Sequence, residues 1–446
     1  MPKADEPALR RDERAQQLLA RQRNTPEAGP VRFGHAAATA ARVARLVRRA
    51  ARRGEVDPEA VTKIVMALAQ LKGIGMKVGQ ILSYIDVALP EELRDALAVL
   101  QTHSPPMSFD VVRSIVKEQL PNRADELLAG MDSTPVAAAS IGQVHRSRLP
   151  DGTAVAVKVQ YPGIARTIRT DFSPAALGGA FSSALFPGAN VPAAIAEARD
   201  RFLEECDYEH EAAAQGRFAA IYADDPVIVV PAVHDSFCTR RVLTTGWLDG
   251  QDFERFLGTA PTQAKRDAAG TALFDFYVGS LFEHGLYNCD PHPGNYLFLE
   301  DGRIGILDYG CTRAFEPEFV GKLARLTRAV HEDRRQALHD AFLDLGMVRR
   351  GQRYDFATAR TLVRAFYGPM LHDVVQVVDL GEAVGMREAI RAKMELMRLS
   401  LPAEFLFLFR IRFGLMSVLA RLGARANWYR LEERWVSQAS TGPGSS

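Results

Sequence analysis

The amino-acid sequence predicts an α+β protein with two lobes, in which a small β-rich lobe follows a helical extension and precedes a larger helical lobe. Three observations lead to this fold class. The chain has 446 residues, which is more than one hydrophobic core usually organises. Apolar and polar residues alternate with a period of two over residues 134–159, which is typical of a β-hairpin. Beyond residue 252 the pattern is helical almost throughout, apart from a second hairpin at residues 296–307.

The element order follows from these patterns. Residues 1–30 are charged and aperiodic, so they are expected to form a disordered arm. The other segments follow in chain order: a helical extension (31–105), a β-rich lobe (106–245), a helical lobe (246–436) and a mobile tail (437–446). Within the β-rich lobe we expect a helix over residues 191–222 and two short strands, at residues 227–233 and 241–248.

Composition excludes several classes of protein. The chain carries 55 Lys+Arg against 54 Asp+Glu, and this net charge of +1 argues against a nucleic-acid-binding protein that works by bulk basicity. Four cysteines without a CxxC pair indicate a reduced interior with no zinc or disulfide framework. The uncharged run over residues 172–196 is rich in Pro, Gly and Ser, and Arg410 and Arg412 interrupt the apolar run over 405–420. We therefore expect a cytoplasmic protein without a transmembrane segment.

A basic amphipathic stretch over residues 42–53 has two interpretations. It is either a helix that lies on an anionic membrane surface or a solvated helix that packs on the main body. Its apolar face has no Trp or Phe, which favours the second interpretation. The first would make the protein peripheral at a membrane.

The strongest group of polar residues lies around the second hairpin. Asn295 precedes its first strand and Asp308 ends its second, so antiparallel pairing should bring these residues side by side. Asp290 lies five residues earlier, on the loop that leads in. Carboxylate and amide oxygens suit Mg²⁺, which keeps nucleotide phosphates as partners. Although such residues also favour turns, the order D-x-x-x-x-N and then D-x-G matches the catalytic loop and metal-binding motif of protein kinases.

The first hairpin offers matching nucleotide-binding residues. Period-two alternation places Ala156 and Lys158 on one face, a small residue for an adenine and an ammonium for phosphates. The loop that opens this hairpin contains Ala137, Ala138, Ala139 and Ser140 where an ordinary kinase has a glycine-rich loop. Alanine restricts φ more than glycine, so this loop should be stiffer over the phosphates.

Two further signals lie outside the standard kinase set. Lys77 and Gln80 share one face of an amphipathic helix over residues 61–84. Helical spacing likewise places Asp207 and Glu211 together but Glu205 elsewhere. An acidic helical stretch is usually a solvated face, so geometry alone does not join these three acids.

Together these motifs resemble the UbiB/ADCK (AarF) family of atypical kinase-like proteins. The resemblance covers residues 60–430 approximately and depends on six motifs: KxGQ (77–80), AAASIGQVH (137–145), AVKVQYPG (156–163), ExD (205–207), DPHPGN (290–295) and LDYG (307–310). Asn288 stands where the family usually has His, Gly246 where Glu is frequent, and Tyr309 in place of Phe. None of these departures removes a metal ligand.

The resemblance implies a protein-kinase-like fold and a role for each motif. Asp290 would be the catalytic-loop aspartate, Asn295 and Asp308 the Mg²⁺ ligands, and Lys158 the phosphate-binding lysine paired with Glu211. The hinge beside the adenine of ATP or ADP would contain Thr245, Trp247 and Leu248. Lys77 and Gln80 would face Glu205 and Asp207 and restrain the site. Family members act as ATPase-like proteins in isoprenoid quinone (coenzyme Q) or lipid metabolism at membranes.

The leading prediction is therefore a Mg·ATP-dependent atypical kinase or ATPase of the UbiB type. A nucleotide-binding scaffold with little turnover is the first alternative, because an intact site does not prove phosphoryl transfer. A small-molecule phosphotransferase is the second alternative, against which the KxGQ helix and the alanine-rich loop count. The partners expected are a nucleotide, an anionic membrane surface and quinone-pathway lipids or proteins, and not a nucleic acid.

Overall fold

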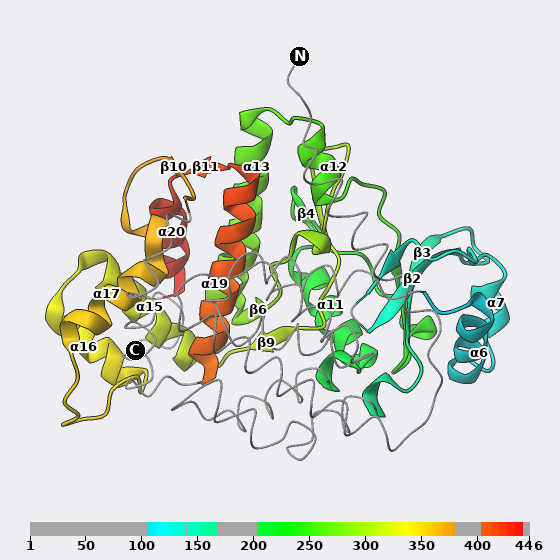
Figure 1. Ribbon diagram of the computed structural model, residues 1–446, viewed down its shortest axis with the longest axis horizontal. Helices are drawn as coiled ribbons and strands as arrows, with labels where there is room; N and C mark the ends of the chain where they lie inside the picture. The colour runs from blue at the N-terminus through cyan, green and yellow to red at the C-terminus, as the bar shows by residue number, and fades with distance from the viewer. Residues whose placement is uncertain (1–105, 140, 167–202, 380–402, 440–446) are drawn as a thin grey trace, which may run out of the picture.

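The computed structural model describes residues 106–139, 141–166, 203–379 and 403–439 of the protein. A small lobe built on a β-sheet lies at one end of the long axis, and a larger helical lobe lies at the other (Figure 1). This arrangement confirms the predicted α+β fold with two lobes. The expected arm, the basic stretch and the KxGQ helix lie outside the described residues.

The small lobe contains a four-stranded antiparallel sheet. Its strands are, in spatial order, β1 (Ala137–Ala138), β2 (Gly142–Arg148), β3 (Ala154–Gln160) and β5 (Val242–Gly246). The β2–β3 turn has Gly152 at φ 89° and the Asp151 carboxylate accepting the Thr153 N–H at 2.8 Å. These contacts explain why the predicted hairpin forms at this place.

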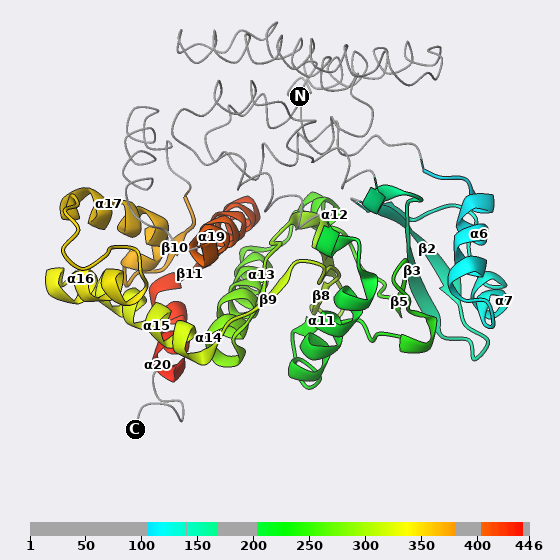
Figure 2. The same ribbon diagram turned by 90° about the horizontal axis from the view of Figure 1, so that it is seen from below.

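Each face of the sheet packs against a helix. The alternation of β3 buries Val155, Val157 and Val159 beneath α6 (Phe109–Gln119) and α7 (Ala124–Leu128), the outer helices of this lobe (Figure 2). Helix α11 (Tyr208–Ile221) lies against the opposite face of the sheet, which contains Lys158. Phe218 of α11 contacts Phe276 and Tyr309, so the C-terminal half of this helix shares the core of the helical lobe.

Short strands join the two lobes. After α11, β4 (Ile228–Val229) pairs in parallel with β8 (Ile304–Ile306), which pairs antiparallel with β7 (Tyr296–Phe298). The β7–β8 pair is the predicted second hairpin. The antiparallel pair β6 (Leu286–Asn288) and β9 (Thr312–Ala314) was not predicted, because three residues are too few to show a period. These strands place both polar motifs at the boundary between the lobes.

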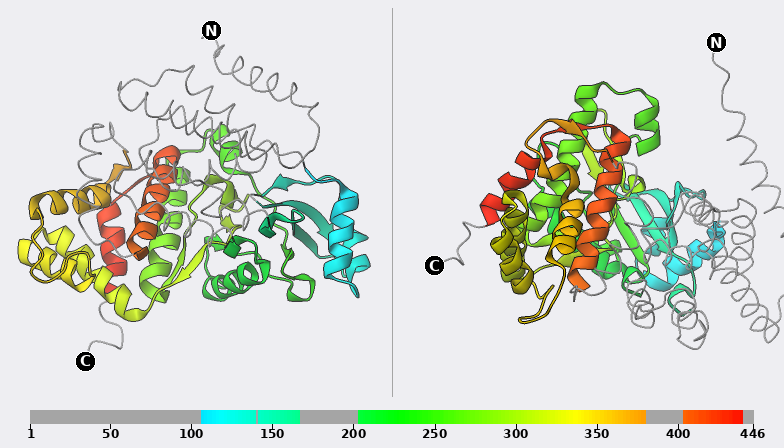
Figure 3. Two further views of the ribbon diagram at one scale, coloured as in Figure 1. Left: turned by 60° about the horizontal axis from the view of Figure 1, so that its bottom comes forward. Right: turned by 60° about the vertical axis from the view of Figure 1, so that its left-hand side comes forward.

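The helical lobe, which Figure 3 shows from two further sides, contains the larger hydrophobic core. Its main elements are α12 (Phe253–Gly258), α13 (Gln263–Phe274), the π-helical η2 (Asp275–Gly279), α14 (Ser280–His284), α15 (Pro317–Glu332), α16 (Arg335–Asp344), α17 (Phe356–Tyr367), β10 (Gln376–Val377), α19 (Ala403–Leu422), β11 (Arg425–Ala426) and α20 (Trp428–Ala439). Short 3₁₀ turns are η1 (Asp235–Phe237), η3 (Pro293–Asn295) and η4 (Gly368–Leu371). A Cβ on Gly270 would lie 2.4 Å from the Ala424 Cβ, so glycine allows α13 to pack closely on the chain after α19.

Helix α20 extends further than the sequence suggested. It includes residues 437–439, which were expected to belong to the mobile tail, because Val436 is buried and Ser437 bonds back to Glu433 at 3.2 Å. Within the described ranges, no helix is long and apolar enough to span a membrane.

A buried ionic cluster joins α15, α19 and α20. Glu432 is fully buried and accepts hydrogen bonds from Arg412 and from the His331 ring, whose nitrogens lie 3.1 Å from Glu432 and 3.2 Å from Glu433. Arg412, which interrupts the apolar run in the sequence, therefore has a charged partner inside the lobe. The cluster also explains how α19 can be buried while carrying a charged residue.

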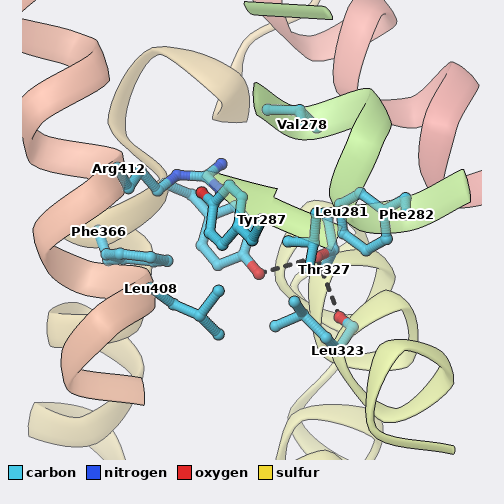
Figure 4. Close-up of a pocket in the computed structure, with 10 residues that line it drawn as sticks. Val278, Leu281, Phe282, Tyr287, Leu323, Thr327, Phe366, Leu408 and Arg412 are labelled. Atoms are coloured by element: carbon cyan, nitrogen blue, oxygen red, sulfur yellow. Dashed lines mark hydrogen bonds between the residues drawn. The ribbon is translucent and has the colours of Figure 1, made fainter. Parts of the chain in front are cut away.

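A small cavity lies beside this cluster (Figure 4). Its volume is about 20 Å³, enough for about one water molecule. Thr327 on its wall shares a hydrogen bond with the Tyr367 hydroxyl at 2.8 Å and donates to the Leu323 carbonyl at 3.1 Å. None of its lining residues belongs to the predicted nucleotide site, so the cavity is a packing feature of the helical lobe.

Candidate nucleotide-binding site

The structure brings together the three polar residues of the second hairpin. The Leu307 N–H donates to the Asn295 carbonyl at 3.0 Å, which places Asp308 beside Asn295 at the open end of β7 and β8. The Asn295 amide donates to the Asp290 carboxylate at 3.0 Å and to its carbonyl at 3.1 Å. Since the amide nitrogen of Asn295 is turned toward Asp290, the side-chain oxygen of Asn295 is the atom that could bind a metal ion.

Asn288 joins the two motifs through hydrogen bonds, and no role was predicted for it. Its amide donates to the Asp308 carbonyl at 2.8 Å, and its side-chain oxygen accepts the Asp290 N–H at 3.0 Å. The sequence showed only that Asn replaces the usual His. Because Asn288 ends β6, directly before the catalytic-loop motif, its position in the chain was the available signal.

Lys158 lies among acidic side chains from two other segments. Its ammonium is 2.9 Å from both oxygens of Glu211 and 3.4 Å from Asp308. The expected Lys158–Glu211 ion pair is therefore present. The side chain of Glu211 is 3% exposed and that of Lys158 is 16% exposed, so water screens the pair weakly.

Burial and charge act in opposite directions on this group. Burial raises the pKa of Glu211 to about 7, although Lys158 opposes the shift. Burial alone would lower the pKa of Lys158, but Asp308 and Glu211 raise it well above its ordinary value. For Asp308, burial is outweighed by Lys158 and by the Gly310 N–H, so the pKa of Asp308 is lowered. A charged lysine and an ionised aspartate therefore face the same site.

The alanine-rich loop lies at the edge of the sheet. Ala137 and Ala138 are exposed and Ala139 is half-buried, and the Ala139 N–H donates to the Gly142 carbonyl at 2.9 Å, which closes a tight turn. Ser140, the fourth residue expected in this loop, lies outside the described residues. The loop leads directly into β2, which pairs with the strand that carries Lys158.

The hinge residues lie beside Ala156. In the β3–β5 register Ala156 pairs with Thr245, and the Trp247 N–H donates to the Ala154 carbonyl at 3.0 Å. A Cβ on Gly305 would lie 2.6 Å from Leu248, so the Leu248 side chain rests on the backbone of β8. The predicted adenine-contacting residues Ala156, Thr245 and Leu248 thus connect the two lobes near Lys158.

The ExD segment differs from the expected geometry. Asp207 does not lie on a helical face with Glu211. It caps the N-terminus of α11 instead, where its side chain accepts the Glu209 and His210 N–H groups. Its carboxylate is 3.6 Å from Arg240. Glu205 lies in the turn of helix before this cap. The expected partners Lys77 and Gln80 lie outside the described residues.

The donor set fits Mg²⁺ only together with a nucleotide. Asp308 supplies a carboxylate and Asn295 an amide oxygen, and no group of three His, Cys, Asp or Glu residues in the described part of the chain could hold a metal ion. Mg²⁺ usually binds through one or two carboxylates and substrate phosphates, not in a cage made of protein alone. The residues present therefore suit a metal ion that arrives with ATP.

The lobes, the Lys158–Glu211 pair and the Asp290–Asn295–Asp308 group define a protein-kinase-like nucleotide site. A family described as the ABC1 atypical kinase-like domain matches residues 99–342, which is more than half of the chain. The chain belongs to this family. The predictions of the UbiB/ADCK family and of an atypical kinase or ATPase are thereby confirmed.

Individual relatives are similar over much of the chain. Atypical kinase COQ8, mitochondrial, from Saccharomyces cerevisiae is 29% identical over 381 residues, 83% of this chain and 75% of that protein. Atypical kinase COQ8B, mitochondrial, from Rattus norvegicus is 31% identical over 285 residues, 64% of this chain and 54% of that protein. The chain thus spans about half the length of the rat relative.

A plant relative and a solved structure extend the comparison. Protein ACTIVITY OF BC1 COMPLEX KINASE 1, chloroplastic, from Arabidopsis thaliana is 32% identical over 309 residues, 66% of this chain and 44% of that protein. The structure of Rv3197 from Mycobacterium tuberculosis in complex with erythromycin has a TM-score of 0.60 and 29% sequence identity. It matches 86% of this chain and 97% of that one.

Proposed function

We propose that the protein binds Mg·ATP between its two lobes and transfers or hydrolyses the terminal phosphoryl group. The observation that supports this most directly is the position of Lys158. Its ammonium bridges Glu211 on α11 and Asp308 on the metal-binding loop, which joins the phosphate and metal sides of the site.

Each side chain then has a definite task. Lys158 binds nucleotide phosphates and is held by Glu211, while Asp308 and Asn295 hold the metal ion, which would neutralise charge on the transferred group. Asp290, held by the Asn295 amide, orients the nucleophile and accepts its proton. The alanine-rich loop covers the phosphates, and Ala156, Thr245, Trp247 and Leu248 enclose the adenine.

We further propose that this activity supports isoprenoid quinone (coenzyme Q) or lipid metabolism at an anionic membrane surface. The motif resemblance to the UbiB/ADCK family and the relatives named COQ8 support this pathway. In this proposal Lys77 and Gln80 of the KxGQ helix restrain the site through Glu205 and Asp207. The Asp207 carboxylate lies near Arg240 and is partly exposed, so it remains accessible to such a cation.

Nucleotide titration tests the site. Calorimetry should show Mg·ATP binding that Asp308→Asn and Lys158→Ala each weaken at least about tenfold, because each removes a charged contact to metal or phosphate. Asp301→Asn is the matched control, since Asp301 is an exposed turn residue at the far end of the same hairpin. Equal affinity in Asp308→Asn and Asp301→Asn would remove Asp308 from the site.

Turnover distinguishes an enzyme from a scaffold. We expect ATP hydrolysis to rise when anionic liposomes and a polyprenyl-phenol analogue are added, and to disappear in Asp290→Asn. Binding of Mg·ATP without turnover under any of these conditions would favour the nucleotide-binding scaffold.

A further inference from the structure

Tyr208 occupies an unusual position behind the nucleotide site. It is the first residue of α11, it directly follows the ExD segment, and it is 0% exposed. Its N–H donates to the Arg240 carbonyl at 3.3 Å, which fixes the start of the helix against the chain entering β5. Neither the motif comparison nor the proposed reaction gives this side chain a role.

The ring of Tyr208 faces the ammonium of Lys158. The Lys158 Nζ lies 5.1 Å from the ring centroid, within the range of a cation–π contact. Tyr208 and Glu211 are three residues apart on α11 and therefore share a face of the helix. One turn of α11 thus places the Glu211 carboxylate and the face of the Tyr208 ring next to the Lys158 ammonium.

The hydroxyl of Tyr208 does not explain this position. It is buried and has no hydrogen-bond partner among the described residues. It lies against Gly142, where an added Cβ would be 2.8 Å from the hydroxyl oxygen and 2.4 Å from the Val159 carbonyl oxygen. A buried hydroxyl without a partner is unfavourable. The useful part of the side chain is therefore its ring.

We propose that Tyr208 is a positioning residue that holds the Lys158 ammonium at the phosphate site through its ring face. This inference rests on the proposed function, in which Lys158 binds phosphate. When Asp308 binds a metal ion, its carboxylate is shared between the metal ion and the Lys158 ammonium. Glu211 and the Tyr208 ring then keep the ammonium in place. A cation–π contact is strongest where water is excluded, as it is here.

A series of ring substitutions separates the contribution of the cation–π contact from that of packing. Tyr208→Phe keeps the ring, and fluorinated phenylalanines at position 208 keep its shape while weakening the negative charge of its face. We expect Tyr208→Phe to bind Mg·ATP within about twofold of the unmodified chain, and affinity to fall stepwise with fluorination to about tenfold, or about 1.4 kcal/mol. Tyr222→Phe and the same fluorinated residues at position 222 are the control, because that side chain lies at the other end of α11.

Unfolding without nucleotide gives a readout that does not depend on the proposed function. Fluorination at position 208 should lower the unfolding midpoint in denaturant when Lys158 is present and leave it unchanged or raised in Lys158→Met. A flat series in both measurements would overturn the inference and leave Tyr208 a packing residue. Loss of all Mg·ATP binding in the unmodified chain, with the unfolding difference retained, would overturn the proposed function and keep the Tyr208–Lys158 contact.

Discussion

At the scale of single residues, Tyr309 occupies the position between Asp308 and Gly310 where the metal-binding motif of protein kinases has Phe. It is fully buried, and its hydroxyl has no hydrogen-bond partner among the described residues. Its ring contacts Phe218 with centroids 5.1 Å apart, which links the metal-binding loop to α11. The ring therefore supplies the packing that Phe would supply, and the hydroxyl adds an unsatisfied polar group.

Tyr309→Phe should therefore be neutral or stabilising. Removing a buried, unpaired hydroxyl is expected to raise the free energy of unfolding by about 1 kcal/mol. In the unmodified chain, folding takes this hydroxyl out of water without giving it a hydrogen-bond partner, and the variant avoids that cost. Urea unfolding measures the change, and Tyr367→Phe is the control, since the Tyr367 hydroxyl shares a hydrogen bond with Thr327. If Tyr309→Phe destabilises as much as the control, the Tyr309 hydroxyl has a partner in solution.

Asn288 connects the two motifs of the candidate site through one hydrogen bond to each, which predicts a role in their alignment. Asn288→Leu keeps the branched shape of the side chain but removes both hydrogen bonds, to Asp290 and to Asp308. We expect ATP turnover to fall about tenfold to a hundredfold, because small displacements of catalytic groups are costly. Asn288→His, the residue that the motif resemblance leads us to expect here, should retain more activity than Asn288→Leu. Equal activity of the two variants would contradict an aligning role.

At the scale of elements, strand β2 contains a buried histidine that titrates. The His145 ring lies 2.8 Å from the Asp132 carbonyl and 2.8 Å from the Gln143 amide, and Phe109 packs beside it. Burial lowers the pKa of His145, although its contact with Asp132 opposes the shift. The folded chain therefore binds a proton at this site less readily than the unfolded chain.

The free energy of unfolding should fall as the pH is lowered below the ordinary pKa of histidine. Above the ordinary histidine pKa of 6.5, His145 is neutral in both the folded and the unfolded chain. Below that pH the unfolded chain takes up the proton first. The free energy of unfolding therefore declines as the pH falls toward the lowered pKa of the folded chain. Unfolding measured between about pH 7 and about pH 5.5 should show a weaker slope in His145→Gln. Equal slopes in His145→Gln and in the unmodified chain would contradict this assignment.

The contact among α15, α19 and α20 depends on a charged group inside the helical lobe. Glu432→Gln would leave Arg412 and His331 without their shared carboxylate, and breaking such a buried pair costs about 3–5 kcal/mol. A matching loss of unfolding free energy is expected in denaturant titrations. Glu433→Gln should cost less, because Glu433 is partly exposed. Similar values for both variants would show that burial does not set the energy of this cluster.

At the scale of the whole molecule, nucleotide binding should link the stability of the two lobes. A ligand that binds only the folded state stabilises it by about 2.7 kcal/mol at a hundredfold excess over its dissociation constant. We expect Mg·ATP to raise the unfolding temperature of the whole protein, and EDTA to remove most of this effect. The Lys158→Ala variant should show little shift. Stabilisation by ATP that EDTA does not change would contradict the metal-binding role of Asp308.

Sequence patterns predicted those elements in which a periodic arrangement of apolar and polar residues continues over several positions. The alternation over residues 134–159 located β2 and β3, and the order of Asp290, Asn295 and Asp308 located a candidate site whose three residues lie together in the structure. Pairs such as β6–β9 were not predictable, because their strands are three residues long and their pairing is set by the surrounding core. The capping role of Asp207 was missed because the predicted helix over residues 191–222 ran through this position, although Asp is a common N-cap residue. Asn288 was missed because both of its hydrogen bonds go to backbone groups, which the motif pattern does not reveal.

The parallel pairing of β4 with β8 has a consequence for how the molecule moves. The Ile304 N–H donates to the Val227 carbonyl at 2.8 Å, so the chain leaving α11 is tied into the helical lobe before it returns to the sheet. Helix α11 is fixed to the sheet through Tyr208 and Glu211 and to the helical lobe through Phe218, so an opening of the lobes must break one of these two sets of contacts. The β4–β8 pair belongs to neither set. In hydrogen–deuterium exchange the Ile304 amide should therefore stay protected during such opening, whereas the Trp247 amide, which directly follows β5, should exchange early.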